Sequence, residues 1–209
     1  MKLIKLVLIT VVILASLLLN QPAWADAGKF KRSPDYAEVV QAIDTLLQSK
    51  DNPEASLTPE QLQLKLADLQ LQKYILETSE TRASCRNATG KTLAVYLRSK
   101  KVPADQPGTL YYLGDGQTTD DDFACQGVFL PAGSVVTFSP LDSAQELTEP
   151  LALKIVEGTQ FAIDRNPETG VVAFNLPPAQ SFKVGEGTWS IPSLTQADID
   201  AQVPNAPAD

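Results

Sequence analysis

Apolar side chains recur at helical spacing soon after residue 33. Ser33 is suited to cap a helix, and Pro34 is suited to its first position, where no N–H group is needed. The pattern predicts one helix with a single apolar stripe, ended by Asp51-Asn52-Pro53. That stripe consists of Tyr36, Val39, Val40, Ile43, Leu46 and Leu47.

A second helix is predicted from Thr58 to about Thr78. Thr58 and Gln61 form a capping-box pattern, with Pro59 between them. At about 100° per residue, its apolar side chains fall on two opposite faces. We expect the first helix to cover one face and the rest of the domain to cover the other; a partner protein is the alternative. One face holds Leu62, Leu66, Leu69 and Leu76, and the other holds Leu64, Leu71 and Ile75.

After Cys85, short runs rich in Val, Phe, Tyr and Thr alternate with Gly, Pro and Asp, which is typical of an antiparallel β-domain. The short connections leave no room for the crossover helices of a parallel sheet. Strands are expected at Thr92–Leu97, Thr109–Leu113, Phe123–Phe129, Val135–Ser139, Leu151–Val156, Gln160–Asp164, Val171–Asn175, Ser181–Val184 and Thr188–Ile191.

Together these patterns predict an α+β fold, in which an N-terminal helical hairpin packs on an antiparallel β-sandwich or small barrel. We expect the hairpin in residues 26–84 and the β-domain in residues 85–192. Residues 193–209 are expected to form a short helix, starting at Ser193-Leu194-Thr195-Gln196, followed by a disordered tail.

The N-terminus has the pattern of a secretory signal peptide, residues 1–25. Lys2 and Lys5 precede the apolar run Leu6–Leu19, and Ala23-Trp24-Ala25 offers small residues at the cleavage site. As a helix the apolar run would reach only about 21 Å, which is short for a membrane span. We therefore expect cleavage, no stable membrane span afterwards, and a periplasmic, lumenal or extracellular location.

The charge of the chain limits the kinds of partner it can bind, and its cysteine content indicates a disulfide. The chain has a net charge of −8, and loss of Lys2 and Lys5 would leave 15 basic residues against 25 acids. Such a chain repels nucleic acid, so nucleic-acid binding is not expected. Cys85 and Cys125 are the only cysteines, and in an exported protein they favour one structural disulfide over two free or intermolecular thiols.

The chain contains no histidine. This excludes Ser-His-Asp and Cys-His catalysis and His-ligated zinc or copper. The segment Asn87–Thr92 ends like a phosphate-binding loop but lacks its first glycine and its helix, and we interpret it as a turn with Gly90 at positive φ.

Asp115, Asp120, Asp121 and Asp122 form the densest charged cluster. Calcium is the cation that such a loop would suit, but the cluster departs from the EF-hand pattern, and a solvated acidic loop is the preferred interpretation. Arg98, Lys100 and Lys101 form a basic cluster that we interpret as a charged strand end, with contact to an acidic partner or lipid headgroups as the alternative.

These observations favour an exported, non-enzymatic binding or interaction module with a protein partner, accessory to a membrane-associated complex. No cofactor is expected apart from the calcium considered above. The alternative is a carboxylate-based hydrolase that acts on glycan or cell-wall material and uses acids near Asp115–Asp122.

Overall fold

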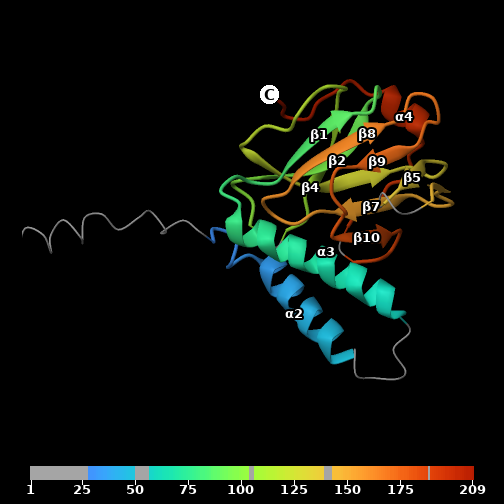
Figure 1. Cartoon of the computed structure of the whole chain (residues 1–209). Coiled ribbons are helices and arrows are strands. Elements are labelled where there is room, and N and C mark those ends of the chain that lie inside the picture. Colours follow the sequence, from blue (N-terminus) through green and yellow to red (C-terminus); the bar gives the residue numbers. More distant parts are fainter. Residues whose placement is uncertain (1–27, 50–56, 104–105, 139–142, 188) are drawn as a thin grey trace, which may run out of the picture.

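The computed structural model describes residues 28–49, 57–103, 106–138, 143–187 and 189–209. The predicted signal peptide, residues 1–25, lies outside these residues. The described chain has an α+β fold, with a helical hairpin beside a sandwich of two five-stranded sheets (Figure 1). In the described segments, no helix combines the length and the apolar character that a membrane span needs.

The helices begin where the sequence predicts. Helix α2 (Pro34–Ser49) starts after Ser33, whose Oγ accepts a hydrogen bond from the backbone N–H of Tyr36 at 3.2 Å. Helix α3 (Pro59–Thr78) starts with the predicted capping box of Thr58 and Gln61. A second capping box, made by Thr195 and Asp198, starts the short helix α4 (Gln196–Asp200).

Each sheet mixes strands from distant parts of the chain. The first sheet contains, in spatial order, β1 (Ser84–Ala88), β8 (Gln160–Arg165), β9 (Val172–Phe174), β5 (Val135–Thr137) and β6 (Gln145–Glu146). The second sheet contains β10 (Gln180–Lys183), β7 (Leu151–Lys154), β4 (Phe123–Leu130), β2 (Leu93–Ser99) and β3 (Thr109–Leu113).

Most strand pairs are antiparallel, as expected, but β1 pairs with β8 and β5 pairs with β9 in parallel. No crossover helix is needed, because the chain between the paired strands runs through other strands. Strands β1 and β6 were not expected from the sequence. Conversely, residues 189–191 form no strand: the Trp189 ring packs edge-on against Tyr96, with ring centroids 4.6 Å apart.

The predicted disulfide is confirmed. Cys85 on β1 and Cys125 on β4 are bonded, with Cα atoms 5.8 Å apart, and both side chains are buried. Because β1 and β4 belong to different sheets, the bond fastens one layer of the sandwich to the other. Around it, buried side chains of both sheets form the main core, including Val95, Val128 and Phe161.

The C-terminal segment is not the loose tail that composition suggested. The backbone N–H of Ala206 donates to the Tyr112 carbonyl oxygen at 2.9 Å, and the Asn205 side chain accepts from the Tyr112 N–H at 2.9 Å. Farther on, the Asp209 N–H donates to Thr118 at 3.0 Å. Strand β3 is the last of its sheet, so the segment covers backbone groups that would otherwise be left at an open edge.

Candidate functional site

One face of α3 is buried against α2 and the sandwich. Leu76 is 0 % exposed and Leu69 is also buried, while Leu62 and Leu66 are half-buried beside them. With side chains of α2 and Val156 of the sandwich they form one apolar cluster, which we call the hairpin cluster. The expectation that the first helix covers one face of the second is therefore confirmed.

The opposite face of α3 is only partly covered by the described chain. Ile75 packs against the hairpin cluster, whereas Leu64 is 56 % exposed and Leu71 is half-buried outside any apolar cluster of the described residues. Tyr74 is 63 % exposed and Ala67 is also exposed. Leu64, Ala67, Leu71 and Tyr74 follow one another at spacings of three, four and three residues, and we call them the outer seam.

A second candidate is a cleft of about 420 Å³ between the start of α2 and the outer face of the second sheet. We call it the charged cleft, because its lining includes Asp35, Arg82, Arg98, Lys154 and Glu157. Trp189 and Gln126 also line it. In the sequence, Arg98 was considered only as part of a basic cluster at a strand end, and the other residues of this cleft were not selected as site residues.

The floor of the charged cleft is a buried ion pair. Arg98 is 6 % exposed, its Nη2 donates to the Glu157 carboxylate, and Glu157 is 14 % exposed. Burial raises the pKa of Glu157, while the Arg98 guanidinium acts in the opposite direction. Arg98 was interpreted as a strand-end charge, and this is wrong: strand alternation places it on the face with Ala94 and Tyr96, which the chain covers.

A second ion pair ties α2 to the cleft. Lys154 Nζ lies 2.9 Å from Asp35 and 2.8 Å from Glu38. The other Asp35 carboxylate oxygen accepts from the backbone N–H of Glu157 at 2.9 Å. The pKa of Lys154 is raised although burial, its largest influence, lowers it, because the Asp35 and Glu38 carboxylates together outweigh burial. The first turn of α2 is thus held to the sandwich by charge.

Three buried polar atoms around the cleft have no hydrogen-bond partner in the described chain: Arg98 Nε, Glu157 Oε2 and Gln126 Oε1. Unsatisfied polar atoms are rare in protein interiors, because each one loses its bonds to water without replacement. Here a donor and two acceptors lie among residues of one cleft, so a ligand or water that can both donate and accept hydrogen bonds would satisfy them.

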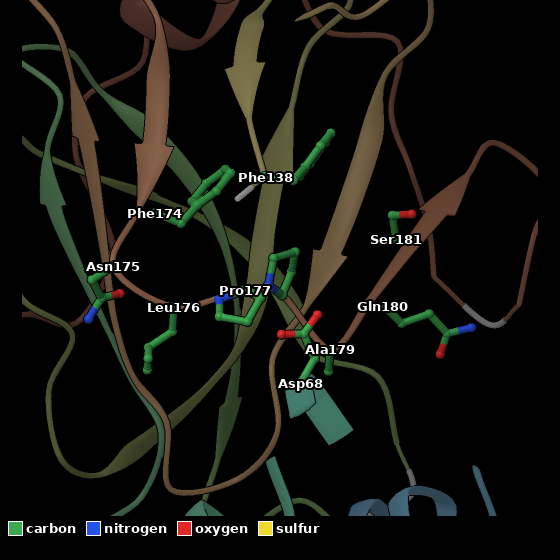
Figure 2. A pocket seen from close by; sticks show the side chains of 10 residues that line it. Asp68, Phe138, Phe174, Asn175, Leu176, Pro177, Ala179, Gln180 and Ser181 are labelled. Carbon is green, nitrogen blue, oxygen red and sulfur yellow. The ribbon is translucent and has the colours of Figure 1, made fainter. Parts of the chain in front are cut away.

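A groove of about 410 Å³ lies where α3 meets the turn between β9 and β10. Figure 2 shows Phe138 and Phe174 on one side and Asp68 of α3 on another. The two phenyl rings are stacked, with centroids 6.2 Å apart. The Asn175 amide is already bonded to the backbone of Gln160 and Ala162. This groove offers fewer polar groups than the charged cleft.

The acidic loop is organised by protein contacts. Asp115 accepts from the Gly90 N–H at 2.8 Å, Asp120 accepts from the Asp122 N–H at 2.6 Å, and Asp122 pairs with Lys100. The Lys100 hydrogen bond lowers the pKa of Asp122. The Asp121 side chain makes no such contact with the described residues. Among the residues that the structure describes, no three acids, cysteines or histidines gather as a metal site would require.

The glycine-containing segment between β1 and β2 is a turn, as interpreted. Gly90 has φ of 73°, and a strand flanks the turn on each side, although a helix was expected before it. The buried Asn87 amide donates to the carbonyl oxygens of Lys91 at 2.7 Å and Leu113 at 2.9 Å. Asn87 therefore stabilises the turn, which lies between two strands and not before a helix as a phosphate-binding loop does.

Comparison of the chain with protein families, with characterised proteins and with solved structures gives no match.

Proposed function

We propose that the protein is an exported, non-enzymatic interaction module that binds a protein partner through the outer seam of α3. The observation that carries this proposal is the exposure of Leu64 and Tyr74 on a helix whose opposite face is already buried. Large apolar side chains gathered on one surface are a feature of protein interfaces.

The spacing of the outer seam favours a helical partner. Apolar residues three and four positions apart form the stripe along which two helices pack side by side, each side chain fitting between side chains of the other helix. The partner is therefore an amphipathic helix of a second protein.

Export is supported by the signal-peptide pattern of residues 1–25 and by the Cys85–Cys125 disulfide, since such bonds persist in oxidising compartments. An exported module with a helix-binding face is suited to an accessory role in a membrane-associated complex. The hydrolase alternative is less favoured: a general acid needs a raised pKa, and in the acidic loop Lys100 lowers the pKa of Asp122.

A photo-reactive amino acid at position 64, introduced in the cells that make the protein, tests this proposal. We expect a cross-link to a helical segment of one partner protein, and a Tyr74→Lys substitution in the same chain should abolish it. Position 65 is the matched control, because Lys65 is exposed on the same helix about 100° away. Equal cross-linking at both positions, or none at position 64, would overturn the proposal.

A further inference from the structure

We propose that the charged cleft binds a small carboxylate that carries a neighbouring N–H or O–H donor, as an amino acid or a hydroxy acid does. This site lies apart from the outer seam and does not depend on the protein partner.

The charge of the cleft is the first argument. Five of the chain's 17 basic residues line it against three acids, although the whole chain carries a net charge of −8. Among the basic residues, Arg82 and Arg32 have no ion pair in the described chain, whereas Lys154 and Arg98 are paired. A concave site with locally positive charge concentrates small anions even on an acidic protein.

The Arg98 guanidinium is the second argument. Its Nη2 donates to Glu157 and its Nη1 donates to the Val102 carbonyl oxygen at 3.3 Å, but the buried Nε–H has no acceptor. A buried guanidinium N–H without an acceptor is suited to donate a charge-assisted hydrogen bond to a carboxylate. Nε is closed to solvent, so the ligand reaches it through a side-chain rotation, after first contact with the more open Arg82.

The two acceptor atoms without partners indicate which other group the ligand carries. Rotation of Glu157 could also join its Oε2 to Arg98 Nε, because both belong to the same ion pair. That closure would still leave Gln126 Oε1 without a donor. A plain anion offers no donor, whereas an amino or hydroxy group beside the carboxylate does. The cleft therefore selects a ligand that has both.

The size and the wall of the cleft fit such a molecule. A volume of about 420 Å³ lies within the usual range of small-ligand sites. Trp189 covers β4 at Gly127, where a Cβ atom would lie 3.0 Å from the indole and 2.0 Å from the Leu153 carbonyl oxygen. Only glycine leaves room there for the neighbouring strand β7 and for the indole, which gives the cleft one apolar wall for the ligand's side chain.

Calorimetric titration of the purified exported protein tests the site. The panel contains amino acids and hydroxy acids, with acetate, sulfate and an alkylamine as single-function probes. We expect at least one amino or hydroxy acid to bind at least tenfold more tightly than each of the three single-function probes. Cleavage after Ala25 would leave Trp189 as the only tryptophan, so its fluorescence should change in parallel.

Two variants and one control locate the binding. Arg82→Ala should weaken it, and the double variant Arg98→Met/Glu157→Leu should abolish it while the protein remains folded. Lys101→Ala removes an exposed charge outside the cleft and should change nothing. Absence of binding across the panel, equal binding of sulfate, or retained binding in the double variant would overturn the inference. None of these results bears on the cross-link at position 64.

Discussion

The buried ion pair between Arg98 and Glu157 gives the sharpest prediction. Glu157→Gln removes the carboxylate that pairs with a guanidinium of only 6 % exposure, and water and salt screen such a buried cation poorly. We expect the free energy of unfolding to fall by about 3–5 kcal/mol, the usual effect of breaking a buried pair. That is a large part of the roughly 5–15 kcal/mol that stabilises a typical domain.

Removing both charges should have a much smaller effect. Because burial raises the pKa of Glu157 despite the neighbouring guanidinium, burial acts on its carboxylate more strongly than Arg98 does. Such a pair contributes little beyond what apolar side chains of similar volume would contribute. The double variant Arg98→Met/Glu157→Leu should therefore lie within about 1 kcal/mol of the parent, or be more stable.

Urea denaturation at pH 7, followed by circular dichroism, measures the unfolding free energies of the parent, the single variants and the double variant. Arg98→Met alone should also be strongly destabilised, because it leaves the Glu157 carboxylate buried without its cation. If Glu157→Gln changes the unfolding free energy by less than about 1 kcal/mol, the pair is solvated like a surface pair and the reasoning is wrong. A double variant as unstable as the single ones would equally refute it.

Three further predictions concern the core. Burial raises the pKa of Tyr96 to about 12. The neutral phenol therefore stabilises the folded protein fully below pH 10, and this stabilisation is lost as the pH rises through about 12. In alkaline denaturation, the Tyr96→Phe variant should lose less stability over that range than the parent. Replacing Cys85 and Cys125 by Ala opens a link across 40 residues and should lower the unfolding free energy by about 4 kcal/mol. Leu76→Ala should cost about 2–5 kcal/mol in urea, whereas the exposed Leu64→Ala should stay within about 0.5 kcal/mol.

Each of these predictions has a contrary result. A phenolate absorbance that rises for Tyr96 near pH 10 would show that its ring is solvated. A cysteine-free protein with an unchanged urea midpoint would show that the two sheets need no covalent link. Equal losses for Leu76→Ala and Leu64→Ala would mean that the hairpin does not bury the face described above.

Local signals in the sequence predicted most of the helical structure. Thr58 and Gln61 specify the start of α3 through groups three residues apart, and the two lone cysteines specify their own pairing. Strand β1 was missed because Ser84–Ala88 lacks the β-branched and aromatic residues typical of strands. It forms a strand because β8, far along the chain, supplies its backbone partners.

The charged cleft could not be predicted for a related reason. Arg98 follows a strand and stands near two lysines, which is typical of an exposed strand end. Its burial depends on Glu157, on the first turn of α2 and on Trp189, three segments that only the tertiary structure brings together. Docking of the C-terminal segment at Tyr112 likewise depends on an open sheet edge that composition does not reveal.

The parallel pairing of β1 with β8 determines the order in which the strands can pair while the chain is being synthesised. Ser84 lies opposite Gln160, and β2, β3, β4 and β7 are all synthesised between the two strands. Four strands of the second sheet are thus available before β1 can find its neighbour. A growing chain that ends before β8 presents an unpaired strand and an unfinished layer, and such edges invite association with other chains. A chaperone that binds the chain during this interval would therefore protect the protein more than one that acts after the last strand has been synthesised.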